Sequence, residues 1–144
     1  MTIKNILVPH DGSASATKAF KKAVQIARQH GSKILVLTCL DIAGIGGWYV
    51  DDRINREIMR TAKNQTKKIF KDLEVIAKKS AVEMNSVIIE TNKPVKTIVS
   101  FSRSKQTDLI IMGSSGRGKF DKFILGSVSN GVLQKAKCPV LIIK

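Results

Sequence analysis

The sequence predicts a doubly wound α/β fold, in which five parallel strands form one sheet in the order 3-2-1-4-5 with helices on both faces. Short apolar runs alternate along the chain with longer segments of helical periodicity, which is typical of strands joined by crossover helices. Two of these runs, residues 33–40 and 109–112, are almost wholly apolar, as expected for strands covered on both faces. Short connections and right-handed crossovers then favour this order, with the first and fourth strands as neighbours.

The first half of the chain begins with a predicted strand over residues 3–9, which Pro9 closes because proline has no N–H to donate to a sheet. A helix is expected over about residues 15–30, where alanine, valine and phenylalanine recur at helical spacing and Gly31 follows as a stop signal. The second strand covers residues 33–40.

The second half continues the alternation of helix and strand. The expected elements are a long helix over residues 51–79, a strand over 82–90, a short helix after Pro94, a strand over 109–112, a helix starting near Ser127 and a last strand over 139–144. Polar positions in the 82–90 strand suggest one edge of the sheet. The last strand is apolar and is expected at the other edge, exposed for pairing with a second copy of the chain.

Length and composition fit one domain covering residues 1–144. The hydrophobic content of 43% is ordinary, and no apolar run approaches the roughly 20 residues of a membrane span. The start, MTIKNILVPHDGS, shows no secretion signal. Cys39 lies in an apolar run and Cys138 precedes a proline, so we expect small core thiols rather than a disulfide or a metal site. These features predict a cytoplasmic protein without a membrane segment.

The formal net charge of +14 makes anionic partners worth considering. Nine of the 25 basic residues fall between Arg53 and Lys79, interleaved with carboxylates as on a solvated helix face. The chain has few aromatic residues and no motif that reads nucleic acid. A nucleic-acid-binding module is therefore the less favoured interpretation of the charge.

A single stretch, DLIIMGSSGRGKFDKFILGSVS, runs from Asp108 to Ser129 and combines a buried-type strand, a glycine-rich loop and a helix start. Glycines allow backbone N–H groups to turn toward an anion, and a helix N-terminus offers unpaired N–H donors and partial positive charge. Ser127 is the predicted N-cap. The stretch therefore predicts two rows of donors for phosphates, with Arg117 adding mobile charge, although glycines and serines can also simply turn a chain.

The spacing within this stretch distinguishes it from other phosphate loops. Gly113, Gly116 and the pair Gly126-Ser127 form the pattern G-x2-G-x9-G-[S/T]. No Gly-Lys-Ser/Thr follows, as a Walker loop needs, and the tight triple-glycine fingerprint of dinucleotide folds is missing after the first strand. In this pattern the chain strongly resembles the universal stress protein family, in its ATP-binding branch.

A second signature, VPxDGS after the first strand, also resembles this family. Asp11 is either a turn carboxylate bonded to nearby backbone N–H groups or an acceptor facing a ligand. The resemblance favours the ligand contact and adds a lesser backbone contact at Pro9. The predicted order brings Asp11 and Gly113 to one crevice, because each follows one of two neighbouring strands.

The resemblance implies an adenine nucleotide alpha hydrolase-like fold and a nucleotide site. Adenine and ribose are expected near Asp11, Cys39 and Met112. The phosphates are expected on the backbone of Gly113, Gly116, Gly118, Gly126, Ser127, Val128 and Ser129. ATP is the expected ligand, with Mg²⁺ held through its phosphates rather than by a protein ligand cluster.

The function implied is that of a nucleotide-dependent stress sensor or switch with at most slow ATP hydrolysis. The alternatives are an AMP or cyclic-nucleotide binder, or a nucleotidyl- or phosphoryl-transfer enzyme on the same crevice. No catalytic residue is assigned, because His10 has no recognisable nucleophile or orienting acid and is expected on the rim of the site.

Two further expectations concern surfaces around the site. The resemblance implies a homodimer through the C-terminal strand Pro139–Lys144. The segment Ala43–Val50 is expected to be a loop on the same sheet edge, where Trp48 and Tyr49 cover a ligand, pack on a partner subunit or simply anchor the loop.

Overall fold

The computed structural model describes residues 2–41, 51–115 and 125–144. The elements are β1 (Asn5–Pro9), α1 (Ala14–His30), β2 (Lys33–Leu40), α2 (Asp52–Lys79), β3 (Met84–Glu90), α3 (Pro94–Ser104), β4 (Leu109–Gly113), α4 (Ser127–Lys135) and β5 (Val140–Ile143). The predicted order of strands and helices is confirmed, and the first and third strands each start two residues later than expected.

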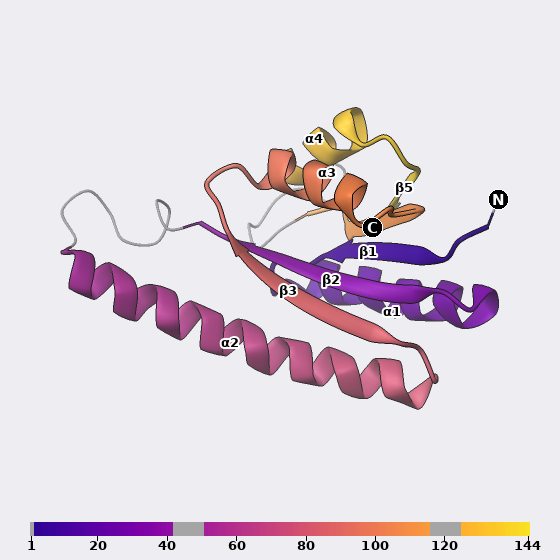
Figure 1. Cartoon of the computed structure of the whole chain (residues 1–144), viewed down its shortest axis with the longest axis horizontal. Coiled ribbons are helices and arrows are strands. Elements are labelled where there is room, and N and C mark those ends of the chain that lie inside the picture. The colour runs from indigo at the N-terminus through magenta and orange to yellow at the C-terminus, as the bar shows by residue number, and fades with distance from the viewer. Residues whose placement is uncertain (1, 42–50, 116–124) are drawn as a thin grey trace.

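The five strands form one parallel sheet in the order β3-β2-β1-β4-β5, as predicted (Figure 1). β1 lies at the centre, where Leu7 is in register with Leu35 of β2 and with Ile110 of β4. The Asp108 carboxylate fixes the start of this pairing, because its Oδ2 accepts from the backbone N–H groups of Lys4 and Asn5, each at 2.9 Å. The winding direction reverses between β1 and β4, which makes this junction the switch point of the sheet.

The helices form one layer on each face of the sheet (Figure 1). α1 and α2 pack on the side to which Ile6 and Val8 point, around buried Phe20. α3 and α4 pack on the opposite side, where Leu7 and Ile110 meet Val132. Alternate residues of the central strands thus enter different cores, as the two-residue period of a strand requires.

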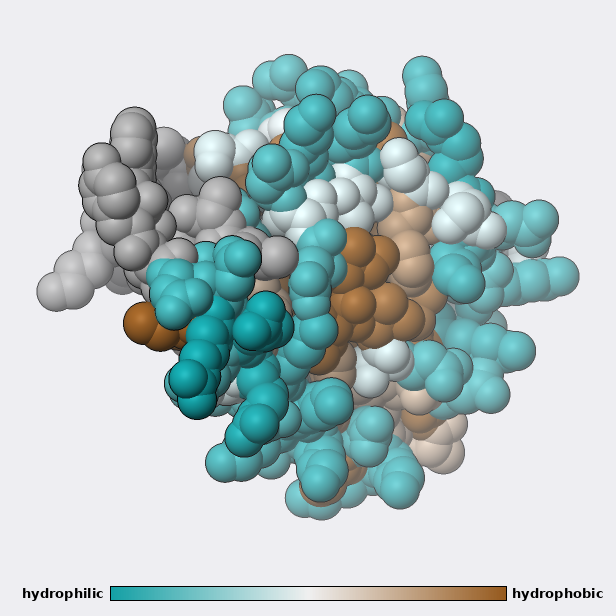
Figure 2. All heavy atoms as spheres, turned by 60° about the vertical axis from the view of Figure 1, so that its left-hand side comes forward, coloured by the Kyte–Doolittle hydropathy of each residue, from teal (hydrophilic) through white to brown (hydrophobic). Residues whose placement is uncertain are grey.

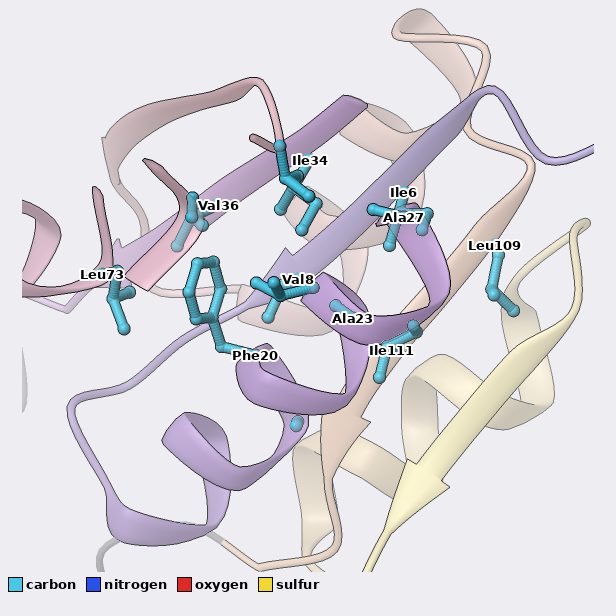
Figure 3. Close-up of a cluster of buried hydrophobic side chains, with 14 of the residues drawn as sticks. Ile6, Val8, Phe20, Ala23, Ala27, Ile34, Val36, Leu73, Leu109 and Ile111 are labelled. Carbon is cyan, nitrogen blue, oxygen red and sulfur yellow. The ribbon is translucent and has the colours of Figure 1, made fainter. Parts of the chain in front are cut away.

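Hydrophilic side chains cover most of the face seen in Figure 2, apart from an apolar patch near its centre. The larger core lies between the sheet and α1 (Figure 3), where Phe20 lies among side chains from the strands and from α2. None of the helices in the described ranges is long and apolar enough to cross a membrane.

α1 has defined signals at both ends, and its start lies beside the carboxyl end of β1. The Ser13 hydroxyl accepts from Ala16 N–H at 3.1 Å and caps the N-terminus. Gly31 ends the helix with a left-handed φ of 67°, where a Cβ would be strained. The N-cap fixes how the chain turns from β1 into α1, and hence where Asp11 lies.

Candidate functional site

A cavity of about 310 Å³ opens at the carboxyl ends of the central strands. Its walls come from the ends of β1, β2 and β4 and from the first residues of α1, α3 and α4. It is lined by Pro9, His10, Asp11, Ser13, Ala16, Leu37, Cys39, Pro94, Ile98, Met112, Gly113, Ser115, Gly126, Ser127, Val128 and Ser129. A cavity at the switch point is where doubly wound folds bind ligands.

Nine of the twelve residues predicted for the site line this one cavity. They are Pro9, Asp11, Cys39, Met112, Gly113, Gly126, Ser127, Val128 and Ser129. Gly116, Arg117 and Gly118 lie outside the described residues, as does the loop Ala43–Val50 with Trp48 and Tyr49. The two sequence signatures, 100 residues apart, therefore meet in space.

The start of α4 is held against the end of β4 by two hydrogen bonds. The buried Ser129 hydroxyl donates to Gly113 O at 2.7 Å, and Gly126 N–H donates to Ser114 O at 2.7 Å. The first backbone bond of the helix is from Asn130 N–H to Gly126 O, at 2.9 Å. The N–H groups of the first turn have no acceptor within the helix, and this turn lines the cavity.

The prediction that Ser127 is the N-cap of α4 is wrong. Gly126 is the N-cap, in extended conformation with φ −60° and ψ 156°, and no side chain caps the helix. Ser127 is the exposed first residue of the helix. A helix start without a side-chain cap leaves its N–H groups available to an anion.

Gly113 is required by a close approach of β4 to α1. A Cβ at this position would overlap Ser15 Oγ and would lie 2.8 Å from the Ser15 backbone carbon. Real Cβ atoms do not tolerate such contacts, and the second one involves backbone that cannot move aside. The Ser15 hydroxyl is buried and has no hydrogen-bond partner among the described residues. The lack of a side chain at Gly113 thus allows β4 and α1 to approach each other beside the cavity.

Asp11 makes the turn contact that the sequence left open, and its side chain also lines the cavity. Its Oδ1 accepts from Ser13 N–H at 2.9 Å, so the turn contact is present. The side chain is also exposed and lines the cavity, which leaves Oδ2 accessible to a ligand hydroxyl.

His10 lines the cavity, but it is buried, with 4% of its surface exposed, rather than lying at an open rim. Its Nδ1 accepts from Gly12 N–H at 3.0 Å, so the ring proton lies on Nε2, which is 3.2 Å from Thr17 Oγ1. Its backbone O accepts from the Thr38 hydroxyl at 2.7 Å. His10 therefore holds the turn between β1 and α1 to the end of β2. Sequence reasoning missed this structural role because no motif marks the partners of His10.

The remaining wall is apolar. Leu37 and Met112 are buried, and Pro94 and Ile98 of α3 add to the same wall. Burial raises the pKa of the Cys39 thiol to about 11, so this side chain is neutral at physiological pH. Sequence reasoning missed Pro94 and Ile98, since only the packing of α3 on the sheet brings them to the cavity.

The cavity therefore joins an apolar wall, one carboxylate and the first turn of a helix. This combination suits a ligand with a flat apolar group, a hydroxyl-bearing middle and an anionic end. Among the described residues, no group of three or more His, Cys, Asp or Glu side chains is placed to hold a metal ion.

Comparisons with known proteins agree with this architecture. The model of the universal stress protein family matches residues 2–144. A universal stress protein of Methanocaldococcus jannaschii is 29% identical over 141 residues, covering 98% of this chain and 82% of its own length. A putative universal stress protein of Staphylococcus saprophyticus is 30% identical over 146 residues, covering 100% of this chain and 85% of its own.

Solved structures show the same fold. Universal stress protein UspA from Lactobacillus plantarum superposes with a TM-score of 0.84 at 27% identity, covering 100% of this chain and 99% of its own. The universal stress protein from Archaeoglobus fulgidus in complex with dAMP has a TM-score of 0.68 at 26% identity, covering 100% of both chains. The match of the family model across nearly the whole sequence, together with this fold, shows that the chain belongs to the universal stress protein family.

Proposed function

We propose that the protein binds an adenine nucleotide in the cavity at the switch point and acts as a nucleotide-dependent switch. The observation that carries this proposal is the convergence of Asp11, Gly113 and the first turn of α4 around one cavity of about 310 Å³. The solved Archaeoglobus fulgidus relative in complex with dAMP supports an adenine nucleotide as the ligand class.

Each part of the cavity suits one part of the nucleotide. The adenine packs against the apolar wall of Leu37, Cys39 and Met112, where burial of a flat ring is favourable. The ribose lies beside Asp11, whose free oxygen accepts from a hydroxyl. The phosphates lie at the first turn of α4, where N–H donors and the helix dipole favour negative charge.

We further propose ATP as the nucleotide, with Mg²⁺ bound through the phosphates. Gly116, Arg117 and Gly118 follow β4 in sequence and would complete the triphosphate site. Mg²⁺ commonly takes phosphate oxygens and waters rather than a full set of protein ligands. No general base is assigned, so the expected response to ATP is binding rather than rapid turnover.

We also propose a homodimer that pairs through β5, in a protein of the cytoplasm. β5 pairs with β4 on one side, and its other side ends the sheet. Leu141 on this edge strand is 36% exposed. An apolar edge strand is a favourable surface for a second copy. Both cysteines are free thiols, which suits a reducing compartment.

The nucleotide proposal is tested by mass spectrometry of small molecules released from freshly purified protein. Calorimetric titrations with ATP, AMP and cyclic AMP, each with and without Mg²⁺, then rank the ligands. The proposal expects an adenine nucleotide in the released fraction and tightest binding of ATP with Mg²⁺. Tighter binding of AMP than of ATP would show that the site prefers a monophosphate. Absence of binding by all three nucleotides would overturn the nucleotide proposal.

A further inference from the structure

The outer face of α2 carries a straight row of cations. Arg53, Arg56, Arg60, Lys67 and Lys71 follow one another at spacings of three, four, seven and four residues. At 3.6 residues per turn these positions fall on one stripe of the helix, about 27 Å long at 1.5 Å per residue. All five side chains are exposed. We call this stripe the cationic row.

No ion pair in the described part of the chain involves the cationic row. The ion pairs found within the described ranges join Lys33 to Glu83 and Lys63 to Glu90. α2 contains nine basic residues but only four acidic ones. The buried side of the helix, through Met59, Phe70 and Leu73, lies about a quarter turn around the helix axis from the row. The charge is therefore directed to solvent.

α1 extends the same surface. It covers the same face of the sheet as α2, and its sequence contains no carboxylate (Figure 1). Its exposed basic side chains are Lys18, Lys21, Lys22 and Arg28. Together the two helices hold 13 of the 25 basic residues and four of the 11 acidic ones. Much of the net charge of +14 thus lies on one helical layer, and none of these basic side chains lines the cavity.

The shape and chemistry of this layer favour one polyanion over others. Helices that lie in membranes insert a continuous apolar face rich in large side chains. Most large apolar side chains of α2 pack toward the sheet, and the two exposed ones, Ile54 and Val75, stand 21 residues apart. Single-stranded nucleic acid is usually gripped by stacking on exposed aromatic rings, and the one aromatic residue of α2, Phe70, is buried. A duplex needs only phosphate contacts, and the row is nearly as long as one duplex turn of about 34 Å.

We propose that the outer face of α1 and α2 binds double-stranded nucleic acid through its phosphates, without reading the base sequence. The expectation that nucleic acid is an unlikely partner rested on the small number of aromatic residues and the absence of a reading motif. A binding mode that contacts only the phosphate backbone requires neither. The surface is separate from the nucleotide cavity, so this proposal does not depend on the proposed function.

The test uses fluorescence anisotropy of a labelled DNA duplex of about two helical turns, or ~20 base pairs. The row variant combines Arg60→Gln, Lys67→Gln and Lys71→Gln. The matched control combines Arg103→Gln, Lys96→Gln and Lys105→Gln, which removes the same charge from exposed positions on and next to α3, on the opposite face of the sheet. Circular dichroism and thermal melting verify that both variants fold.

The row variant is expected to lose at least tenfold in affinity for the duplex near 50 mM salt. The slope of the logarithm of its binding constant against the logarithm of salt concentration is expected to become shallower by about 0.9 for each phosphate contact removed. The control variant is expected to keep an affinity within about threefold of the wild type, since its substituted residues lie outside the proposed binding face of α1 and α2. Equal losses in both variants would show that net charge alone attracts DNA and would overturn the proposal. Binding to phosphatidylserine vesicles without binding to the duplex would overturn it as well.

Discussion

The Ser129 hydroxyl lies 2.7 Å from the Gly113 carbonyl oxygen and ties the first turn of α4 to the end of β4. Both residues line the cavity, and the bond spans 16 positions in the sequence. This bond joins the two elements directly, so the start of α4 and the end of β4 keep a fixed spacing. The proposed phosphate site depends on this spacing.

Ser129→Ala removes this bond and leaves a buried carbonyl without its partner. We expect the free energy of unfolding to fall by about 1–3 kcal/mol, the usual cost of an unsatisfied buried polar group. Urea denaturation measures this change. Ser127→Ala is the control, because that side chain is exposed and caps nothing, and it should change stability by less than about 0.5 kcal/mol. Equal changes in the free energy of unfolding for the two substitutions would show that the Ser129 hydrogen bond does not stabilise the fold.

Gly113→Ala forces a methyl group against Ser15. We expect a loss of about 1–3 kcal/mol or more, because overpacking strains rigid neighbours. Ser15→Ala alone should be neutral or slightly stabilising, since it removes a buried hydroxyl that has no partner among the described residues. Chemical denaturation of the two single variants and the double variant tests the pair. The double variant should recover only part of the loss, because the added methyl still meets the Ser15 backbone. Wild-type stability of Gly113→Ala would contradict the close approach.

The raised pKa of Cys39, about 11, predicts slow alkylation. The thiolate is the reactive form, so at pH 8 iodoacetamide should modify Cys39 at least tenfold more slowly than a free thiol of pKa about 8.5. The rate should climb as the pH rises toward 11, because the fraction of thiolate grows over that interval. Mass spectrometry in a Cys138→Ser background follows this single thiol, and a rate at pH 8 equal to that of free cysteine would be incompatible with its burial.

Leu141→Lys places a charge on the exposed edge strand β5. If two copies pair there, the variant should elute as a monomer where the wild type elutes as a dimer, since burying an unpaired lysine is unfavourable. Light scattering after gel filtration gives the masses. Leu133→Lys on α4 is the matched control, at 45% exposure against 36% for Leu141, and should leave the dimer intact. A monomeric wild type would rule out the proposed homodimer.

The sequence predicted the fold well because its signals are local. The apolar runs mark β2 and β4, helical spacing marks α1 and α2, and short connections restrict the strand order. Asp11 and Gly113 were expected at one crevice, and both line the cavity, because each stands at the carboxyl end of one of two neighbouring strands. Such positions converge in any doubly wound sheet.

The parts that could not be predicted depend on packing. Pro94 and Ile98 reach the cavity only because α3 docks on the sheet, and nothing near them in sequence indicates a site. Ser127 was predicted as the N-cap of α4 from its residue type and its place before the helix. The structure turns Ser129 inward to Gly113, and Gly126 takes the cap position.

Calorimetric titration of Gly126→Val with ATP and Mg²⁺ tests the central claim most directly. Gly126 has a φ of −60° and a ψ of 156°, which valine also adopts, so the variant should fold while its side chain fills the space at the start of α4. Asn130→Val is the matched control, because it adds the same side chain to an exposed position of α4 that does not line the cavity. We expect Gly126→Val to abolish ATP binding and Asn130→Val to keep wild-type affinity. Unchanged affinity in a folded Gly126→Val protein would contradict a phosphate site at the first turn of α4.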